Sequence, residues 1–199
     1  MGSAQSRVVR SATRGDRDGV TRMLAAAFQD DPVMGFIFPD EANRRARLPR
    51  FFGLLYDGDG QHGARFVTDG QEAATLWRRP GSAHISLREK IVQAVPWLFA
   101  AGGALGRVMV VGTASDAQHP AEPHWYLHVA GCSPAHQGKG FGKAAIRAGL
   151  ARARADGVPA YLETANENNL AFYQALGFRV TGAWRIPGGP PMWSMLAAG

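Results

Sequence analysis

The chain of 199 residues contains a single cysteine, Cys132, which excludes an internal disulfide and a zinc site built from cysteines. It has no run of 18 uncharged apolar residues, so we expect no transmembrane helix. Its start lacks the charged region, apolar stretch and cleavage site of a signal peptide. These absences predict a protein of the reducing cytoplasm, and no metal is expected.

Blocks of like charge are also missing. Lys and Arg number 22 and Asp and Glu number 16, which gives a net charge of +6, but the basic residues are scattered along the chain. Proteins that bind nucleic acid more often carry a basic stripe, and stable membrane anchoring needs an apolar or polybasic signal. We therefore expect neither partner. The positive charge suits an anionic ligand such as a phosphate-bearing cofactor.

The apolar content of 46% is enough for a compact core. We find no repeat and no linker, so we expect residues 1–5 to be a disordered or processing-derived N-terminus and residues 6–199 to form one α/β domain. Alternation of apolar and polar residues predicts strands over 6–13, 124–132, 159–165, 179–186 and 191–198, with two more within 64–80. Helical spacing predicts helices over 14–28, 41–58, 86–103, 142–156 and 168–178, with a turn at 56–63 and a loop or short helix at 30–40.

Three glycines, Gly138, Gly140 and Gly142, stand between a predicted strand and a predicted helix. The first N–H groups of a helix have no partner within the helix, and the helix dipole favours negative charge there. Glycine lets a phosphate approach the backbone closely because it has no Cβ atom. The segment 137–143 is therefore predicted to hold a phosphate.

Two familiar phosphate patterns do not fit this segment. The dinucleotide pattern needs a different glycine spacing, with an acidic residue about 20 residues further on. The nucleotide-triphosphate pattern needs Ser or Thr after Lys143, where Ala144 stands, and a glycine at the position of Gln137. Both nucleotide interpretations are poor.

The arrangement Gln137-x-x-Gly140-x-Gly142 resembles the cofactor loop of the GCN5-related N-acetyltransferases, the GNAT family. A second segment, "NENNLAFYQALGF", resembles another signature of that family, with Asn166 seven residues before Tyr173 and then Gly-Phe. The two signatures occur in the family's order with a predicted strand between them. Several segments are further similar to the puromycin N-acetyltransferase-like subfamily.

The resemblance implies the GNAT fold, an α/β (α+β) domain with a single mixed, mostly antiparallel sheet of about six or seven strands. The sheet is splayed in its middle and flanked by helices. It also implies an acyltransferase that uses acetyl-CoA, releases CoA and acetylates a primary amine of a small molecule, including an antibiotic-like one, by direct attack in a ternary complex. A protein N-terminal or lysine acetyltransferase and a non-catalytic CoA-binding sensor stay open as alternatives. Many members of the family are dimers, so a homodimer is compatible with the resemblance.

The resemblance also places the cofactor. Acetyl-CoA would lie where strands 125–132 and 160–164 splay apart, because unpaired backbone groups there can bond the pantetheine amides. The predicted cofactor-binding residues are Ala130, Gly131, Cys132, Gln137, Gly138, Lys139, Gly140, Phe141, Gly142, Lys143, Asn166 and Tyr173. Four of them have structural alternatives: Gly131 as steric relief rather than a bulge that opens the splay, Cys132 as a small apolar side chain, Asn166 as a helix N-cap, and the two lysines as solvated side chains.

The transfer chemistry needs a group that accepts a proton from the amine and a group that protonates the departing thiolate. The resemblance places Tyr173 as the general acid. The base is Glu163 or His128, which lie on neighbouring strands, and a purely structural role for each or a proton relay through water stays open.

The predicted substrate-binding residues are Asp30, Asp31, Tyr126 and Glu163, with the two aspartates attracting a cationic amine. A helix-terminating turn before Pro32 is the alternative for the aspartates. An apolar acceptor wall is expected from aromatic side chains that could equally form the core, namely Phe36, Phe38, Phe51, Phe52, Trp97 and Phe99.

Overall fold

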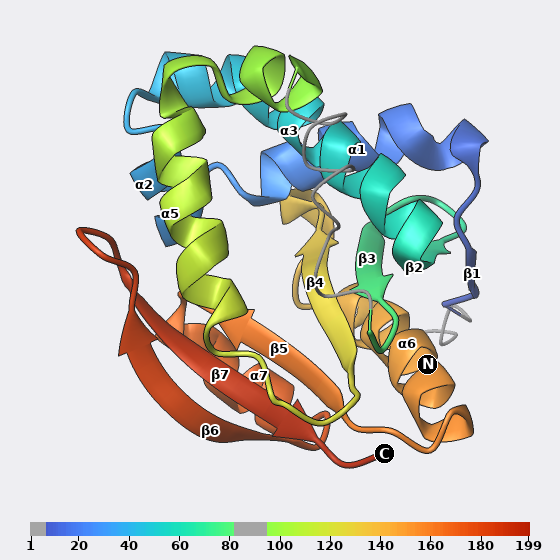
Figure 1. Ribbon diagram of the computed structural model, residues 1–199. Helices are drawn as coiled ribbons and strands as arrows, with labels where there is room; N and C mark the ends of the chain where they lie inside the picture. The colour runs from blue at the N-terminus through green and yellow to red at the C-terminus, as the bar shows by residue number, and fades with distance from the viewer. Residues whose placement is uncertain (1–6, 82–94) are drawn as a thin grey trace.

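The computed structural model describes residues 7–81 and 95–199 (Figure 1). The expected N-terminal tail at 1–5 and the first part of the expected helix at 86–103 lie outside the described residues. In the described ranges the strands are β1 (Val9–Ser11), β2 (Gly63–Thr68), β3 (Ala73–Arg78), β4 (Trp125–Cys132), β5 (Ala160–Thr164), β6 (Phe178–Arg185) and β7 (Pro191–Ala197).

These seven strands of the described chain form one sheet in the order β1-β2-β3-β4-β5-β7-β6. Neighbouring strands run antiparallel except β4 and β5, which run parallel. The prediction of a single mixed, mostly antiparallel sheet flanked by helices is confirmed.

Helices cover both faces of this sheet. They are α1 (Arg17–Ala27), α2 (Pro32–Ile37), α3 (Glu41–His62), α5 (Leu105–Asp116), α6 (Phe141–Ala155) and α7 (Leu170–Gln174). Leu76 and Trp77 are consecutive in β3, so their side chains point to opposite faces. Leu76 packs in the cluster of α1 and α3, whereas Trp77 packs in the cluster of α6 and α7. Figure 1 shows α5 running from the end near α2 and α3 toward β5 and β7.

The predicted turn at 56–63 is wrong, because α3 continues to His62. Gly58 and Gly60 each disfavour a helix by about 1 kcal/mol. Tyr56 and Asp59 in the same segment are fully buried, and Asp59 accepts a hydrogen bond from Arg78 Nε at 2.7 Å. These tertiary contacts outweigh the glycine cost, so Asp59 stands on a helix that faces the sheet.

A β-bulge interrupts the pairing of β3 with β4. Leu76 pairs with Val129 and Trp77 pairs with Leu127, so His128 is the extra residue. A bulge places two consecutive side chains on the same face and reverses the alternation that follows. Leu127 accordingly packs toward α6, whereas His128 and Val129 both face α1 and α3.

The bulge is therefore not at Gly131, where the sequence had suggested it. Gly131 pairs regularly with Ala74, and a Cβ atom there would overlap Leu24 and approach Phe28 of the α1 segment. Close packing of α1 on β4 explains this glycine, which is the steric alternative considered above.

β4 and β5 pair over a short distance. The pairs are Trp125 with Ala160, Tyr126 with Tyr161 and Leu127 with Leu162, and within the described residues the pairing stops there. Beyond that point β4 continues for five residues and β5 for two. The sheet is thus splayed in the middle, as predicted.

As far as the described residues go, one helix, Val95–Asp116, is apolar and long enough to cross a membrane by length and composition alone. The core helix of a soluble protein meets the same criterion. A 3-10 turn at Gly102–Ala104 divides this helix. The expectation of no transmembrane helix stays a prediction.

The packing of α6 on the sheet yields a test of stability. A Cβ atom at Gly149 would overlap the fully buried indole ring of Trp77. We expect Gly149→Ala to lower the free energy of unfolding by about 1–3 kcal/mol, measured by urea denaturation, because the rigid core cannot yield. The matched variant Gly106→Ala lies in α5 with open space around it and should be neutral or stabilising. Equal effects of the two variants would contradict this packing.

Candidate active site

A cavity of about 350 Å³ lies where β4 and β5 separate. Its lining includes Asp31, Glu163 of β5, Tyr173 of α7, and Tyr126, His128 and Ala130 of β4, so the structure brings six predicted site residues together. The lining combines polar groups with a wall of apolar side chains, as small-molecule sites commonly do. The wall includes Phe51, Phe52 and Trp97 as expected, with Phe28 in addition. Three other expected aromatics do not line it: Phe36, Phe38 and Phe99.

Glu163 is held by hydroxyl groups from three elements. Ser115 of α5 donates a short hydrogen bond to Oε2, the Tyr161 hydroxyl donates to Oε1 at 2.9 Å, and the Tyr126 hydroxyl lies 3.5 Å from Oε2. Burial raises the pKa of Glu163 to about 7, although these hydrogen bonds oppose the shift. A carboxyl with that pKa can exchange a proton near neutral pH, as a general base must.

The two tyrosines beside Glu163 stay protonated. Burial, followed by the charge of Glu163, raises the pKa of Tyr126 and of Tyr161 far above the usual value. The Tyr161 hydroxyl also lies 2.9 Å from the Ser194 hydroxyl, which can donate to it, and 3.1 Å from the Gln118 carbonyl oxygen. Both phenols therefore act as neutral hydrogen-bond donors to the carboxylate.

His128 bonds to Asp59, which in turn pairs with Arg78. Its Nδ1 lies 2.7 Å from Asp59 Oδ2, and Arg78 Nε lies 2.7 Å from Asp59 Oδ1. Burial, together with the charge of Arg78, lowers the pKa of His128 despite the opposing effect of Asp59. The ring is therefore neutral at neutral pH.

Tyr173 is buried and faces the cavity from α7. Burial, with the charge of Asp31 added, raises its pKa to about 12. Its neighbour Phe172 is exposed, so Tyr173 is the core aromatic of the pair. A phenol that stays protonated in a buried position can donate a proton to a poorly solvated anion.

The two predicted acceptor aspartates differ in position. Asp31 lines the cavity, and one of its carboxylate oxygens caps α2 by accepting hydrogen bonds from the N–H groups of Val33 and Met34. Burial raises the pKa of Asp31, and the two backbone hydrogen bonds oppose the shift. Asp30 is exposed and is not among the residues that line the cavity.

The glycine segment forms the start of α6. Gly138 and Gly140 have φ values of 73° and 85°, in the left-handed region that favours glycine. Gly140 is the N-cap of α6 and has no side chain to bond to the first N–H groups of the helix, and the space around Gly138 is open. Gln137, Gly138 and Lys139 are exposed. This segment therefore presents backbone N–H groups that fit a phosphate.

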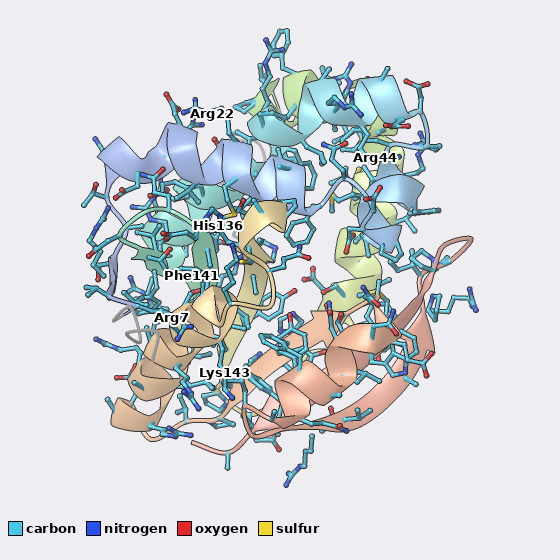
Figure 2. The ribbon with its side chains drawn as sticks, turned by 180° about the vertical axis from the view of Figure 1, so that it is seen from behind. Arg7, Arg22, Arg44, His136, Phe141 and Lys143 are labelled. Carbon is cyan, nitrogen blue, oxygen red and sulfur yellow. The ribbon has the colours of Figure 1, made fainter. Side chains whose placement is uncertain are left out.

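Basic and aromatic side chains surround this start of α6 (Figure 2). The Arg7 guanidinium lies 5.6 Å from the ring of Phe141, and His136 contacts the same ring at 5.8 Å. Lys143 lies on the first turn of α6, whereas the Lys139 ammonium bonds to the Ala135 carbonyl at 2.9 Å. Positive charge thus adds to the anion-binding character of the backbone.

The edge of β4 leads from this segment into the cavity. Ala130, Gly131 and Cys132 lie beyond the last residue that pairs with β5. Burial raises the pKa of the Cys132 thiol, although the Gly142 N–H opposes the shift, so the thiol is not activated as a nucleophile. A pantetheine arm fits this unpaired edge.

Asn166 adopts the alternative role foreseen for it. Its side chain caps the 3-10 turn Glu167–Asn169 by accepting a hydrogen bond from the Asn168 N–H at 3.0 Å. Asn169, rather than Asn166, lines the cavity. A contact between Asn166 and the cofactor stays a prediction.

Several residues of the site were not predicted from the sequence. Asp59 lay in the predicted turn at 56–63, and Ser115 lay outside the predicted helices and strands. Tyr161 carried a usable signal, because it lies two residues before Glu163 and therefore on the same strand face. Arg7 and Arg78 had no signal, since only the fold brings them to the site.

Comparison with known proteins assigns the chain to a protein family. The model of the acetyltransferase (GNAT) family matches residues 71–178, which is over half of the chain. The chain belongs to the GNAT acetyltransferase family.

Solved structures agree with this assignment. A Corynebacterium glutamicum protein described as histone acetyltransferase HPA2 and related acetyltransferase is 26% identical, with a TM-score of 0.72 over 96% of both chains. Polyamine N-acetyltransferase of Drosophila melanogaster is 18% identical, with a TM-score of 0.58 over 96% of this chain and 99% of that one. Arylalkylamine N-acetyltransferase 2 from Aedes aegypti is 10% identical, with a TM-score of 0.63 over 96% of this chain and 98% of that one. The last two share the fold.

The raised pKa of Glu163 predicts a pH-dependent stability. The folded carboxyl keeps a proton up to a pKa of about 7, whereas the unfolded carboxyl releases it near 4.5, so stability is lost as pH rises between these values. We expect the free energy of unfolding of Glu163→Gln, relative to that of the wild type, to increase by about 1–3 kcal/mol from pH 5 to pH 8. Thermal unfolding across that pH range measures the difference. The control is Glu41→Gln, because Glu41 is exposed and pairs with Arg45 at the surface. Its difference in stability from the wild type should show no such change with pH. A pH-independent difference for Glu163→Gln would contradict a raised pKa.

Proposed function

We propose that the protein is an acetyl-CoA-dependent N-acetyltransferase that acetylates a primary amine of a small molecule by direct attack in a ternary complex. The observation that carries the proposal is the convergence of Glu163 and Tyr173 on one cavity at the splay of the sheet. The family and the amine-acetylating enzymes that share the fold support it.

The residues present fit the cofactor. Backbone N–H groups from 137 to 143 would hold the pyrophosphate, with Arg7 and Lys143 adding positive charge. The unpaired β4 edge at Ala130, Gly131 and Cys132 would hold the pantetheine amides. When bound, acetyl-CoA supplies the acetyl group as a thioester.

Two side chains of the cavity would then each transfer one proton. Glu163 accepts the proton that the amine nitrogen loses as its bond to the acetyl carbon forms. Tyr173 donates its phenol proton to the sulfur as the carbon–sulfur bond breaks. Glu163 is a better proton acceptor than His128, because its pKa is about 7 while the pKa of His128 is lowered. Water then returns the proton from Glu163 to Tyr173.

The shape and charge of the cavity favour a small cationic acceptor. A volume of about 350 Å³ with an aromatic wall suits a compact molecule rather than an extended peptide. Carboxylates of Asp31, Asp116 and Glu163 line it and attract an ammonium group. Similarity to the puromycin N-acetyltransferase-like subfamily makes an antibiotic-like amine a candidate. A cytoplasmic location, a homodimer and the absence of nucleic-acid and membrane partners stay part of the proposal.

The sensor alternative predicts binding without turnover. The position of Tyr173 in the cavity argues against it, because a sensor has no need of a buried proton donor there. The experiment is release of free thiol from acetyl-CoA with a panel of monoamines, diamines and aminonucleosides, alongside an N-terminal peptide. Binding of acetyl-CoA with no turnover of any amine would overturn the proposal, and turnover of the peptide alone would favour the protein acetyltransferase.

Tyr173→Phe tests the proton donor. We expect kcat to fall by about 10²–10⁴-fold while the Kd for acetyl-CoA, measured by calorimetry, is unchanged, because only the transferable proton is removed. The matched variant Tyr56→Phe removes a buried phenol outside the cavity lining, whose hydroxyl donates to the Thr13 carbonyl, and should keep its activity. Full activity of Tyr173→Phe would remove Tyr173 from this role.

Gly138→Ala tests the phosphate site. Its Cβ atom would enter open space where the phosphate is expected, so we predict a rise of about tenfold or more in the Kd for CoA, measured by calorimetry. Gly157→Ala is the control, because Gly157 has a similar positive φ of 67° and open surroundings at the far end of α6. The two variants share the backbone strain. If both bind CoA like wild type, the cofactor does not contact Gly138.

A further inference from the structure

The His128 ring stands between a buried carboxylate and the cavity. Asp59 is 0% exposed and does not line the cavity, whereas His128 does. Nδ1 faces Asp59 at 2.7 Å, so Nε2, on the opposite edge of the ring, is the nitrogen left for the cavity side. His128 lies on the same strand face as Tyr126 two residues earlier, and the bulge places Val129 on that face as well.

Asp59 determines which ring nitrogen carries the proton. Burial alone would raise the pKa of Asp59, but its hydrogen bond with His128 and the charge and hydrogen bond of Arg78 hold it below its usual value. An ionised carboxylate only accepts hydrogen bonds, so Nδ1 must donate. In a neutral ring Nε2 then carries a lone pair and can only accept.

The surroundings keep the ring neutral. Arg78 on β3 and Asp59 on α3 oppose each other, Asp116 of α5 adds a weaker negative charge, and the Tyr126 ring lies 5.3 Å away on β4. Burial decides the balance and lowers the pKa of His128. The cavity that Glu163 lines therefore also presents a fixed neutral acceptor.

We propose that Asp59 is a positioning residue that fixes His128 as the Nδ1–H tautomer. Nε2 then accepts a hydrogen bond from the substrate amine, and this bond orients the lone pair of the amine nitrogen toward the acetyl carbon. The inference rests on the proposed function. Replacing a buried ion pair by apolar residues often leaves the stability of a protein unchanged or raises it. We therefore assign the Asp59–Arg78 pair the orientation of His128 as its function rather than stabilisation of the fold.

Asp59→Asn tests the proposal without changing the shape of the side chain. Arg78 requires an acceptor, so the Asn carbonyl turns to Arg78 and its NH₂ group faces Nδ1. His128 must then carry its proton on Nε2 and can no longer accept from the amine. We expect kcat/KM for the amine to fall by about tenfold or more, with the Kd for acetyl-CoA unchanged.

Asp57→Asn is the matched control on the same helix. Asp57 is exposed and pairs with Arg17 at 2.8 Å, so its loss should leave activity and pH profile as in wild type. Equal activity of Asp59→Asn and Asp57→Asn would overturn the proposal. If the wild type acetylates no amine at all, the proposed function fails instead.

A second measurement does not depend on the folding of a variant. Nitrogen-15 NMR of the histidine rings in the wild-type protein should show His128 protonated on Nδ1 and not on Nε2 at pH 7.5. A proton on Nε2 would overturn the proposal whatever the activity. His128→Asn should keep a donor near Asp59 but lose the acceptor in the cavity, so a folded, fully active His128→Asn would also overturn it.

Discussion

The short parallel contact between β4 and β5 is the constraint on which the rest of the site depends. After Leu127 and Leu162 the two strands part, so the backbone groups of the β4 edge have no partner on β5. Buried backbone groups need hydrogen-bond partners, and an extended ligand can supply them. The same separation opens the cavity, which both Glu163 and His128 line. One interruption in a hydrogen-bond ladder thus creates the cofactor edge and the acceptor cavity together.

Two buried carboxylates near the cavity show how neighbours determine charge. Glu163 is surrounded by hydroxyl groups, which compensate burial only in part, and its pKa rises to about 7. Asp59 is buried more deeply, but Arg78 and His128 lie beside it and its pKa is lowered. One group can therefore exchange a proton near neutral pH, whereas the other supplies a permanent negative charge. Glu163 and Asp59 are both carboxylates, but we assign proton transfer to the first and orientation of His128 to the second.

Local patterns in the sequence predicted the sheet, the helix after the glycines and the GNAT family. The strand over 124–132 and the pair within 64–80 follow from alternation, which depends only on neighbouring residues. The end of α3 could not be predicted, because the burial of Asp59 overrides the two glycines beside it. The bulge at His128 has no local signal, since it exists only in the register between two strands. Ser115 joined the site because α5 lies across β5, a contact between distant parts of the chain.

The bulge also divides β4 into two halves whose side chains are out of phase. Before it, Leu127 belongs to the layer under α6; after it, Ala130 takes that side and Val129 takes the other. Removal of His128, the extra residue, would restore regular alternation and leave Leu127 and Val129 on the layers they occupy now. What would be lost is the ring that bonds to Asp59. The bulge thus inserts a polar residue of the site into β4 while both apolar layers keep their packing.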